Sequence, residues 1–187
     1  MDDTRLRNSG DPDGRGLVLV YTGDGKGKTT AALGLALRTV GHGLKAYVIQ
    51  FMKGPGNLYG ERVAAREYLP GLTIVHSGRD QFVNRSAPAE IDRELAARGL
   101  DLARQVIAAG EHALVILDEI NVAADYGLVE TRDVLDLVES RPPHVNIVLT
   151  GRRAPREFIE IADTVSEIKE IKHHYGSGVA ARRGIEY

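Results

Sequence analysis

The chain has 187 residues, of which 43% are hydrophobic and 27% are charged, and its formal net charge is -2 at neutral pH. This length suits one domain with a sizeable core and is short for two large ones. The balanced charge does not indicate a nucleic-acid or anionic-membrane partner, and the absence of cysteine excludes disulfides, thiolate metal ligands and a thiol nucleophile.

The beginning of the chain is polar, and residues 1–15 are predicted to form a flexible N-terminal arm. The arm contains no apolar segment of the kind that a secretory signal requires, and no later run reaches membrane-spanning length. Together with the lack of cysteine, this favours a cytoplasmic protein. The remaining residues, 16–187, are expected to form a single domain.

Beyond the arm, short apolar runs alternate with longer segments of helical periodicity. This pattern predicts an α/β fold with a mainly parallel sheet and helices on both of its faces. The apolar runs are continuous rather than alternating, most clearly in ALVIL and NIVLT, which favours strands buried on both faces. Six strands are predicted, at residues 17–21, 46–51, 72–76, 113–117, 145–149 and 165–171.

Helices are predicted between these strands. The segment TTAALGLALRTV is rich in strong helix formers, and Pro88 marks the start of a second helix with one apolar face. Two shorter helices are expected near residues 132–139 and 155–162. Long connections, MKGPGNLYGER and SGRDQFVNRSAP, follow the second and third strands, and ligands of open α/β sheets bind at this end of the strands.

A glycine-rich loop, TGDGKGKTT, follows the first strand and opens the first helix. In a P-loop, backbone N–H groups surround a polyphosphate, a lysine reaches its terminal oxygens and the next Ser or Thr binds Mg²⁺. Gly27, Lys28 and Thr29 match the second half of that pattern, but Thr22 stands where the first glycine is expected. The alternative is a glycine-rich turn without a ligand; the strand before the loop and the helix after it favour nucleotide triphosphate binding.

A pair of carboxylates, Asp118 and Glu119, ends the apolar strand in LVILDE. A carboxylate at this position is what a magnesium–nucleotide site requires opposite its P-loop. In an ATPase, Asp118 would organise Mg²⁺ and Glu119 would polarise an attacking water. Without hydrolysis, either carboxylate could serve the metal, and Asp118 could instead support the strand end.

Several segments, in the same order from about residue 16 onward, closely resemble the P-loop type of ATP:corrinoid adenosyltransferase. These segments are GDGKGKTTAALGLALRTVGHG, VIQFMKG, YGER, LVILDEIN, NIVLTGR, ADTVSEIKEIKH and GIEY. Members of that family lack the first P-loop glycine, have a RecA-like domain and act on cob(I)alamin or cob(I)yrinic acid a,c-diamide. The resemblance implies that ATP lies with its triphosphate reversed, that Co(I) attacks the ribose 5′ carbon and that triphosphate leaves.

The resemblance also implies roles for individual residues. Lys26, Lys28 and Glu119 would be catalytic, and Mg²⁺ or Mn²⁺ would be held by Thr29 and Glu119 with Asp118 in support. Co(I) carries no proton, so the protein needs no general base and its task is positioning and stabilising the leaving triphosphate. The residues expected to contact ATP are Gly23, Asp24, Gly25, Lys26, Gly27, Lys28, Thr29 and Thr30.

One segment departs from the family pattern. Well-known members carry a Phe-x-Trp pair soon after the glycine that here is Gly78, whereas this chain reads SGRDQFVNR and has no tryptophan. We hypothesise that Phe82 contacts the corrinoid instead. The resemblance further implies a homodimer and a reductase or flavodoxin-like electron donor, with neither nucleic acid nor a membrane as partner.

Other candidates are weaker. Arg152 follows a strand and could meet phosphate. Adjacent His173 and His174 point in different directions and lack spaced partners, so we do not expect them to bind a metal. Two other functions remain open: a P-loop ATPase or kinase, and an ATP-dependent corrinoid-binding protein without turnover. The identity of the released product separates all three.

Overall fold

A computed structural model describes residues 14–56 and 59–187, so most of the predicted N-terminal arm lies outside the described residues. Six strands form one sheet in the order β3-β2-β4-β5-β1-β6, and every neighbouring pair is parallel. The predicted α/β fold with a parallel sheet is therefore confirmed. The strands are β1 (Val18–Thr22), β2 (Ala46–Phe51), β3 (Leu72–Ser77), β4 (Leu114–Asp118), β5 (Asn146–Thr150) and β6 (Thr164–Glu167).

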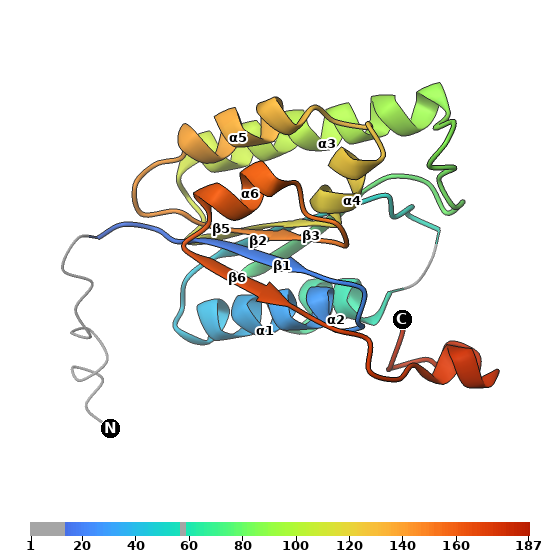
Figure 1. Ribbon diagram of the computed structural model, residues 1–187. Helices are drawn as coiled ribbons and strands as arrows, with labels where there is room; N and C mark the ends of the chain where they lie inside the picture. The colour runs from blue at the N-terminus through green and yellow to red at the C-terminus, as the bar shows by residue number, and fades with distance from the viewer. Residues whose placement is uncertain (1–13, 57–58) are drawn as a thin grey trace.

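Helices cover both faces of this sheet (Figure 1): α1 and α2 lie on one face, and α3, α4, α5 and α6 lie on the other. None of the helices in the described part of the chain is both long and apolar enough to cross a membrane. The helices are α1 (Lys28–Gly41), α2 (Gly60–Tyr68), α3 (Glu90–Ala109), α4 (Ile120–Asp125), α5 (Thr131–Glu139) and α6 (Arg156–Ile161).

The core consists of two apolar layers, one on each side of the sheet. Successive side chains of a strand point to opposite faces, and β4 shows the result: Leu114 and Ile116 join the layer under α1, whereas Val115 and Leu117 join the layer under α3. The central strands are buried on both faces, which confirms the prediction made from their continuous apolar sequences.

Three details differ from the sequence-based expectation. The connection predicted at residues 52–62 ends inside α2, and α4 was not predicted. These helices have nine and six residues, so each offers too few turns for a helical period to be recognised in the sequence. The sixth strand was predicted at residues 165–171 but ends at Glu167. It pairs with β1, which itself ends at Thr22, and all its residues are exposed because it forms an edge of the sheet.

The carboxyl ends of the parallel strands lie together along one side of the sheet, across the strand ends, and this side is called the carboxyl edge. The polar groups at the carboxyl edge come from four different strands. The glycine loop follows β1, Lys53 follows β2, Asp118 ends β4 and Thr150 ends β5. Ligands of open α/β sheets bind at this edge. The fold thus brings together residues that are far apart in the sequence.

Candidate functional site

The glycine loop turns from β1 into α1, and its lysine is folded back onto it. The Nζ atom of Lys28 donates hydrogen bonds of 2.7 Å to the carbonyl oxygens of Gly23 and Gly25. Lys28 is 6% exposed, and burial lowers the pKa of its ammonium group while the nearby Glu119 carboxylate opposes this shift. In P-loop proteins, a loop of this kind and the first amides of the helix after it bind phosphate groups.

Packing explains the unusual glycine spacing of this loop. A Cβ atom at Gly23 would clash with the backbone of Ile168, and one at Gly25 would clash with Ile168 and Lys169. The backbone N–H of Gly25 donates to the Ile168 carbonyl, 2.7 Å away. Both glycines are therefore required by the chain segment that follows β6. Thr22, at the position of the missing first glycine, is the buried last residue of β1.

Asp118 is completely buried and accepts hydrogen bonds on both of its oxygens. Its Oδ1 atom accepts from the hydroxyls of Thr29, at 2.8 Å, and Thr150, at 2.7 Å. Its Oδ2 atom accepts from Gln50 Nε2, at 3.1 Å, and from Lys53 Nζ, at 3.2 Å. Through these four hydrogen bonds, the Asp118 carboxylate connects the phosphate loop to β2 and β5.

Glu119 adopts a left-handed backbone conformation, with φ of 63°. A residue with a Cβ atom reaches this region only at a cost; here the Glu119 N–H donates to Thr150 Oγ1 at 3.0 Å, which stabilises the turn. The carboxylate lines the cleft beside the phosphate loop. Burial raises its pKa, and the Asp118 charge raises it further, while Lys28 opposes both.

A polar cluster that the sequence analysis missed lies on the side of β2. Lys53 Nζ is 3.7 Å from Glu61 Oε1 and 5.1 Å from the centre of the Tyr59 ring. Gln50 Nε2 also donates to Glu61, at 3.2 Å, so Gln50 and Lys53 both join Glu61 to Asp118. Burial opposes the charge of Lys53, but Asp118 and Glu61 together outweigh it and raise the Lys53 pKa.

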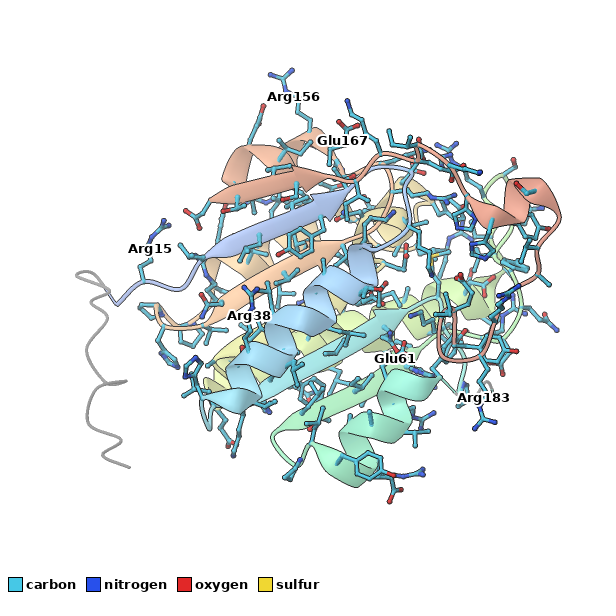
Figure 2. The ribbon with its side chains drawn as sticks, turned by 90° about the horizontal axis from the view of Figure 1, so that it is seen from below. Arg15, Arg38, Glu61, Arg156, Glu167 and Arg183 are labelled. Carbon is cyan, nitrogen blue, oxygen red and sulfur yellow. The ribbon has the colours of Figure 1, made fainter. Side chains whose placement is uncertain are left out.

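These groups surround a cleft of about 590 Å³. Residues 25–30 form one wall, and Lys53 with Glu61 lines another. Figure 2 shows Glu61 at the end of α2 that faces the cleft. Arg152, the weaker phosphate candidate, also lines the cleft and lies 3.9 Å from Asp24. Of the predicted site residues, residues 25–30 and Glu119 line the cleft, and Asp118 lies behind it and bonds Thr29; Gly23 and Asp24 are not among the lining residues.

The last part of the chain lies against the cleft, and residues 184–187 are among those that line it. Figure 1 shows it passing the end of β6, forming a short 3₁₀ helix (His174–Ser177) and returning towards α2. We call residues 182–187 the C-terminal turn. Glu186 accepts a 2.6 Å hydrogen bond from Lys26 Nζ, which lowers its pKa, and lies 3.2 Å from His174 Nε2.

Phe82 is fully exposed and is not part of the cleft wall. The loop that carries it is nevertheless held on both sides. Arg79 forms two hydrogen bonds of 2.7 Å with Asp92 at the start of α3. Arg85 donates to Asp125 at 2.9 Å and lies over the ring of Tyr126, which does line the cleft. Phe82 is thus presented to solvent from an anchored loop beside the cleft.

Within residues 14–56 and 59–187, no group of three or more His, Asp or Glu side chains is arranged to hold a metal ion by itself. The expectation that His173 and His174 point in different directions was wrong, because their rings stack with their centres 4.5 Å apart. The Thr29 hydroxyl and the Glu119 carboxylate are hard oxygen donors of the kind that Mg²⁺ prefers when phosphate oxygens complete its coordination.

A phosphate loop after the first strand of a parallel sheet, with a carboxylate pair at the end of another strand, defines a P-loop nucleotide-binding protein. The family model for ATP:corrinoid adenosyltransferase BtuR/CobO/CobP matches residues 14–187. The chain therefore belongs to the corrinoid adenosyltransferase family and is an enzyme that transfers an adenosyl group from ATP to a corrinoid.

Curated relatives agree with this family. A corrinoid adenosyltransferase of Pseudomonas aeruginosa is 37% identical over 94% of this chain and 85% of the relative. The corrinoid adenosyltransferase of Escherichia coli K12 is 36% identical over 94% of this chain and 87% of the relative. Corrinoid adenosyltransferase CobA of Salmonella typhimurium is 35% identical over 92% of this chain and 86% of the relative.

Proposed function

We propose that the protein transfers the 5′-deoxyadenosyl group of ATP to the Co(I) of a reduced corrinoid. In this reaction the Co(I) electron pair forms a Co–C bond to the ribose 5′ carbon, the C–O bond to the triphosphate breaks and inorganic triphosphate leaves with the electron pair. The observation that carries the proposal is the single cleft in which the phosphate loop, Lys26, Lys28 and Glu119 meet, in a chain of this family.

The cleft has the charge distribution that a leaving triphosphate requires. Lys26, Lys28, Lys53 and Arg152 all line it. Because Lys28 is largely buried, its charge acts in a medium of low dielectric constant, where it stabilises a developing negative charge more strongly than in water. Residues 23–30 are the proposed ATP contacts, with Lys26 and Lys28 stabilising the leaving group.

We assign the magnesium or manganese ligands to Thr29 and Glu119. Asp118 accepts the Thr29 hydroxyl proton in a hydrogen bond, which directs the lone pairs of that oxygen away from Asp118. Asp118 is already bonded to four donors and serves as support. The ion, when bound, neutralises phosphate charge.

The corrinoid is proposed to approach the side of the cleft that Tyr126 lines, next to the loop of Phe82. A corrinoid ring offers a large apolar surface, and an exposed aromatic side chain on an anchored loop suits contact with such a surface. Arg79 and Arg85 hold this loop at both ends, so Phe82 is positioned without being buried. A homodimer and a reductase or flavodoxin-like electron donor complete the proposed assembly.

The competing activity is ATP hydrolysis, because a partly buried glutamate with a raised pKa beside a phosphate loop could also act on water. An anaerobic assay with ATP, Mg²⁺ and chemically reduced cobalamin separates the two. We expect a light-sensitive adenosylcorrinoid together with triphosphate. Orthophosphate released with an unchanged corrinoid spectrum would instead identify an ATPase, and tight ATP binding without any product would identify a binding protein.

Two substitutions to valine in α1 test whether the activity measured in this assay comes from the proposed site. Thr29→Val removes the hydroxyl that bonds Asp118 and should reduce turnover by at least tenfold. Thr39→Val removes a hydroxyl of α1 that bonds only the Leu35 carbonyl within the helix and should leave turnover unchanged. Equal losses in both variants would refute the proposed role of Thr29.

A further inference from the structure

The contact between Lys26 and Glu186 places an anionic group of the protein inside the proposed triphosphate site. Glu186 lies in the C-terminal turn, and its Oε2 atom accepts from Lys26 Nζ at 2.6 Å. Both residues line the same cleft as Lys28 and Glu119. A carboxylate at this position is paired with a cation that a phosphate oxygen would also attract.

The environment of Glu186 is incomplete. Its Oε1 atom is buried and receives no hydrogen bond from any residue that the structure describes, although His174 Nε2 is within ion-pair distance at 3.2 Å. A buried acceptor without a donor is unfavourable. The hydrogen bond from Lys26 to Oε2 is therefore the main interaction of the Glu186 side chain, and Oε1 contributes little.

The C-terminal turn is also weakly attached by its backbone. Its backbone hydrogen bonds are internal: Glu186 N and Ile185 N both donate to Arg182 O, and Gly184 N donates to Tyr187 O. Within the described part of the chain, residues 180–187 form no backbone hydrogen bond with another element. Ile185 and Tyr187 remain 64% and 47% exposed. Few interactions besides the Lys26 contact oppose movement of this turn.

We propose that triphosphate displaces Glu186 from Lys26 when it binds, and that Glu186 competes for Lys26 again to promote release of the triphosphate product. This inference rests on the proposed function, because it concerns the same site and the same leaving group. A triphosphate held by several cations would dissociate slowly, and product release limits turnover in many enzymes. Because Glu186 belongs to the same chain, its carboxylate is present at a high local concentration beside Lys26. It therefore lowers the affinity of the site for triphosphate without blocking the site permanently.

Tripolyphosphate binding tests the competition directly, without corrinoid or turnover. Glu186→Gln keeps the shape of the side chain and removes its charge. We expect tripolyphosphate to bind about twofold to fivefold more tightly to this variant and to dissociate more slowly, the effect expected when one partly screened ion pair no longer competes. Titration calorimetry and stopped-flow displacement at low ionic strength measure the two quantities.

Two further variants identify the cause. In a Lys26→Met background, Glu186→Gln should no longer change the affinity, because the cation for which the two anions compete is gone. Glu170→Gln removes the same charge from an exposed position, so it controls for net charge and should not change the affinity.

Weaker or unchanged tripolyphosphate binding by Glu186→Gln would overturn the proposal, and so would an equal gain in the Lys26→Met background. Failure of adenosyl transfer would refute the proposed function and leave this binding result intact. The two hypotheses can therefore fail separately.

Discussion

Thr29 and Asp118 are 89 positions apart in the sequence, yet the Thr29 hydroxyl donates a 2.8 Å hydrogen bond to Asp118 Oδ1. The bond joins the first turn of α1 to the end of β4, two elements that do not follow each other in the chain. The position of Asp118 in turn depends on Gln50, Lys53 and Thr150. The proposed phosphate and metal groups are thus held by one buried network.

The pairing of Lys53 with Asp118 predicts a non-additive effect on stability. Lys53→Met should destabilise the fold by roughly 3 to 5 kcal/mol, because it leaves the completely buried Asp118 charge without its cationic partner. Asp118→Asn should destabilise it less, because Lys53 keeps Glu61 at 3.7 Å. The double variant should be more stable than the sum of the two losses predicts, by about 1 to 3 kcal/mol. Urea unfolding of the four proteins measures this coupling, and strictly additive losses would show that the pair is not coupled.

The raised pKa of Glu119 predicts that ionisation of this residue destabilises the fold. The penalty is absent below the ordinary glutamate pKa of about 4.3, grows as the pH rises towards the raised folded-state pKa and is complete above it. Glu119→Gln removes the charge, so it should be more stable than the wild type at about pH 8 and lose this advantage at about pH 3.5. Denaturant titrations at both pH values test this, and an equal difference at both would contradict it.

Loss of Lys28 should be far more damaging than loss of an exposed lysine. Lys28→Ala removes a buried cation and the donor to the Gly23 and Gly25 carbonyls, so kcat/KM should fall about 10²- to 10³-fold. Lys45 is exposed and 3.8 Å from Glu111, and Lys45→Ala is the matched control. Steady-state kinetics and ATP titrations measure both variants; a comparable loss in the control would point to a general effect of charge.

Phe82→Ala should impair the enzyme without destabilising it. The side chain is fully exposed, so the free energy of unfolding should change by less than about 0.5 kcal/mol. Turnover should decrease more when Co(II) corrinoid and an electron donor are supplied than when chemically reduced Co(I) is supplied. Tyr68→Ala, another exposed aromatic at the end of α2, is the control. Equal activity of Phe82→Ala and the wild type under both conditions would refute the role of Phe82.

The central part of the fold could be predicted because it depends on local sequence. Continuous apolar runs predicted the buried strands, and the glycine loop and the Asp118–Glu119 pair were recognisable at the ends of two of them. The helices α2 and α4 are too short for a helical period to be recognised in the sequence, and the edge strand β6 ends where its neighbour β1 ends. Such boundaries depend on tertiary contacts that single-sequence patterns do not contain.

The supporting residues of the site were harder to predict, for two physical reasons. Lys53 and Gln50 act only because β2 lies beside β4, and strand order is not visible in the sequence; polar residues at the end of the apolar run VIQFMKG were the available signal. Glu186 reaches Lys26 only because the chain turns back after β6, and no local pattern predicts that return.

The strand order has a consequence for how this protein tolerates change. The phosphate loop and the carboxylate pair belong to β1 and β4, and β5 lies between them. Thr150 at the end of β5 donates to Asp118 and accepts from the N–H of Glu119, although it does not line the cleft. Through this hydroxyl, β5 helps to position both carboxylate residues relative to the phosphate loop, so substitutions in β5 are expected to change the reaction without contacting either substrate.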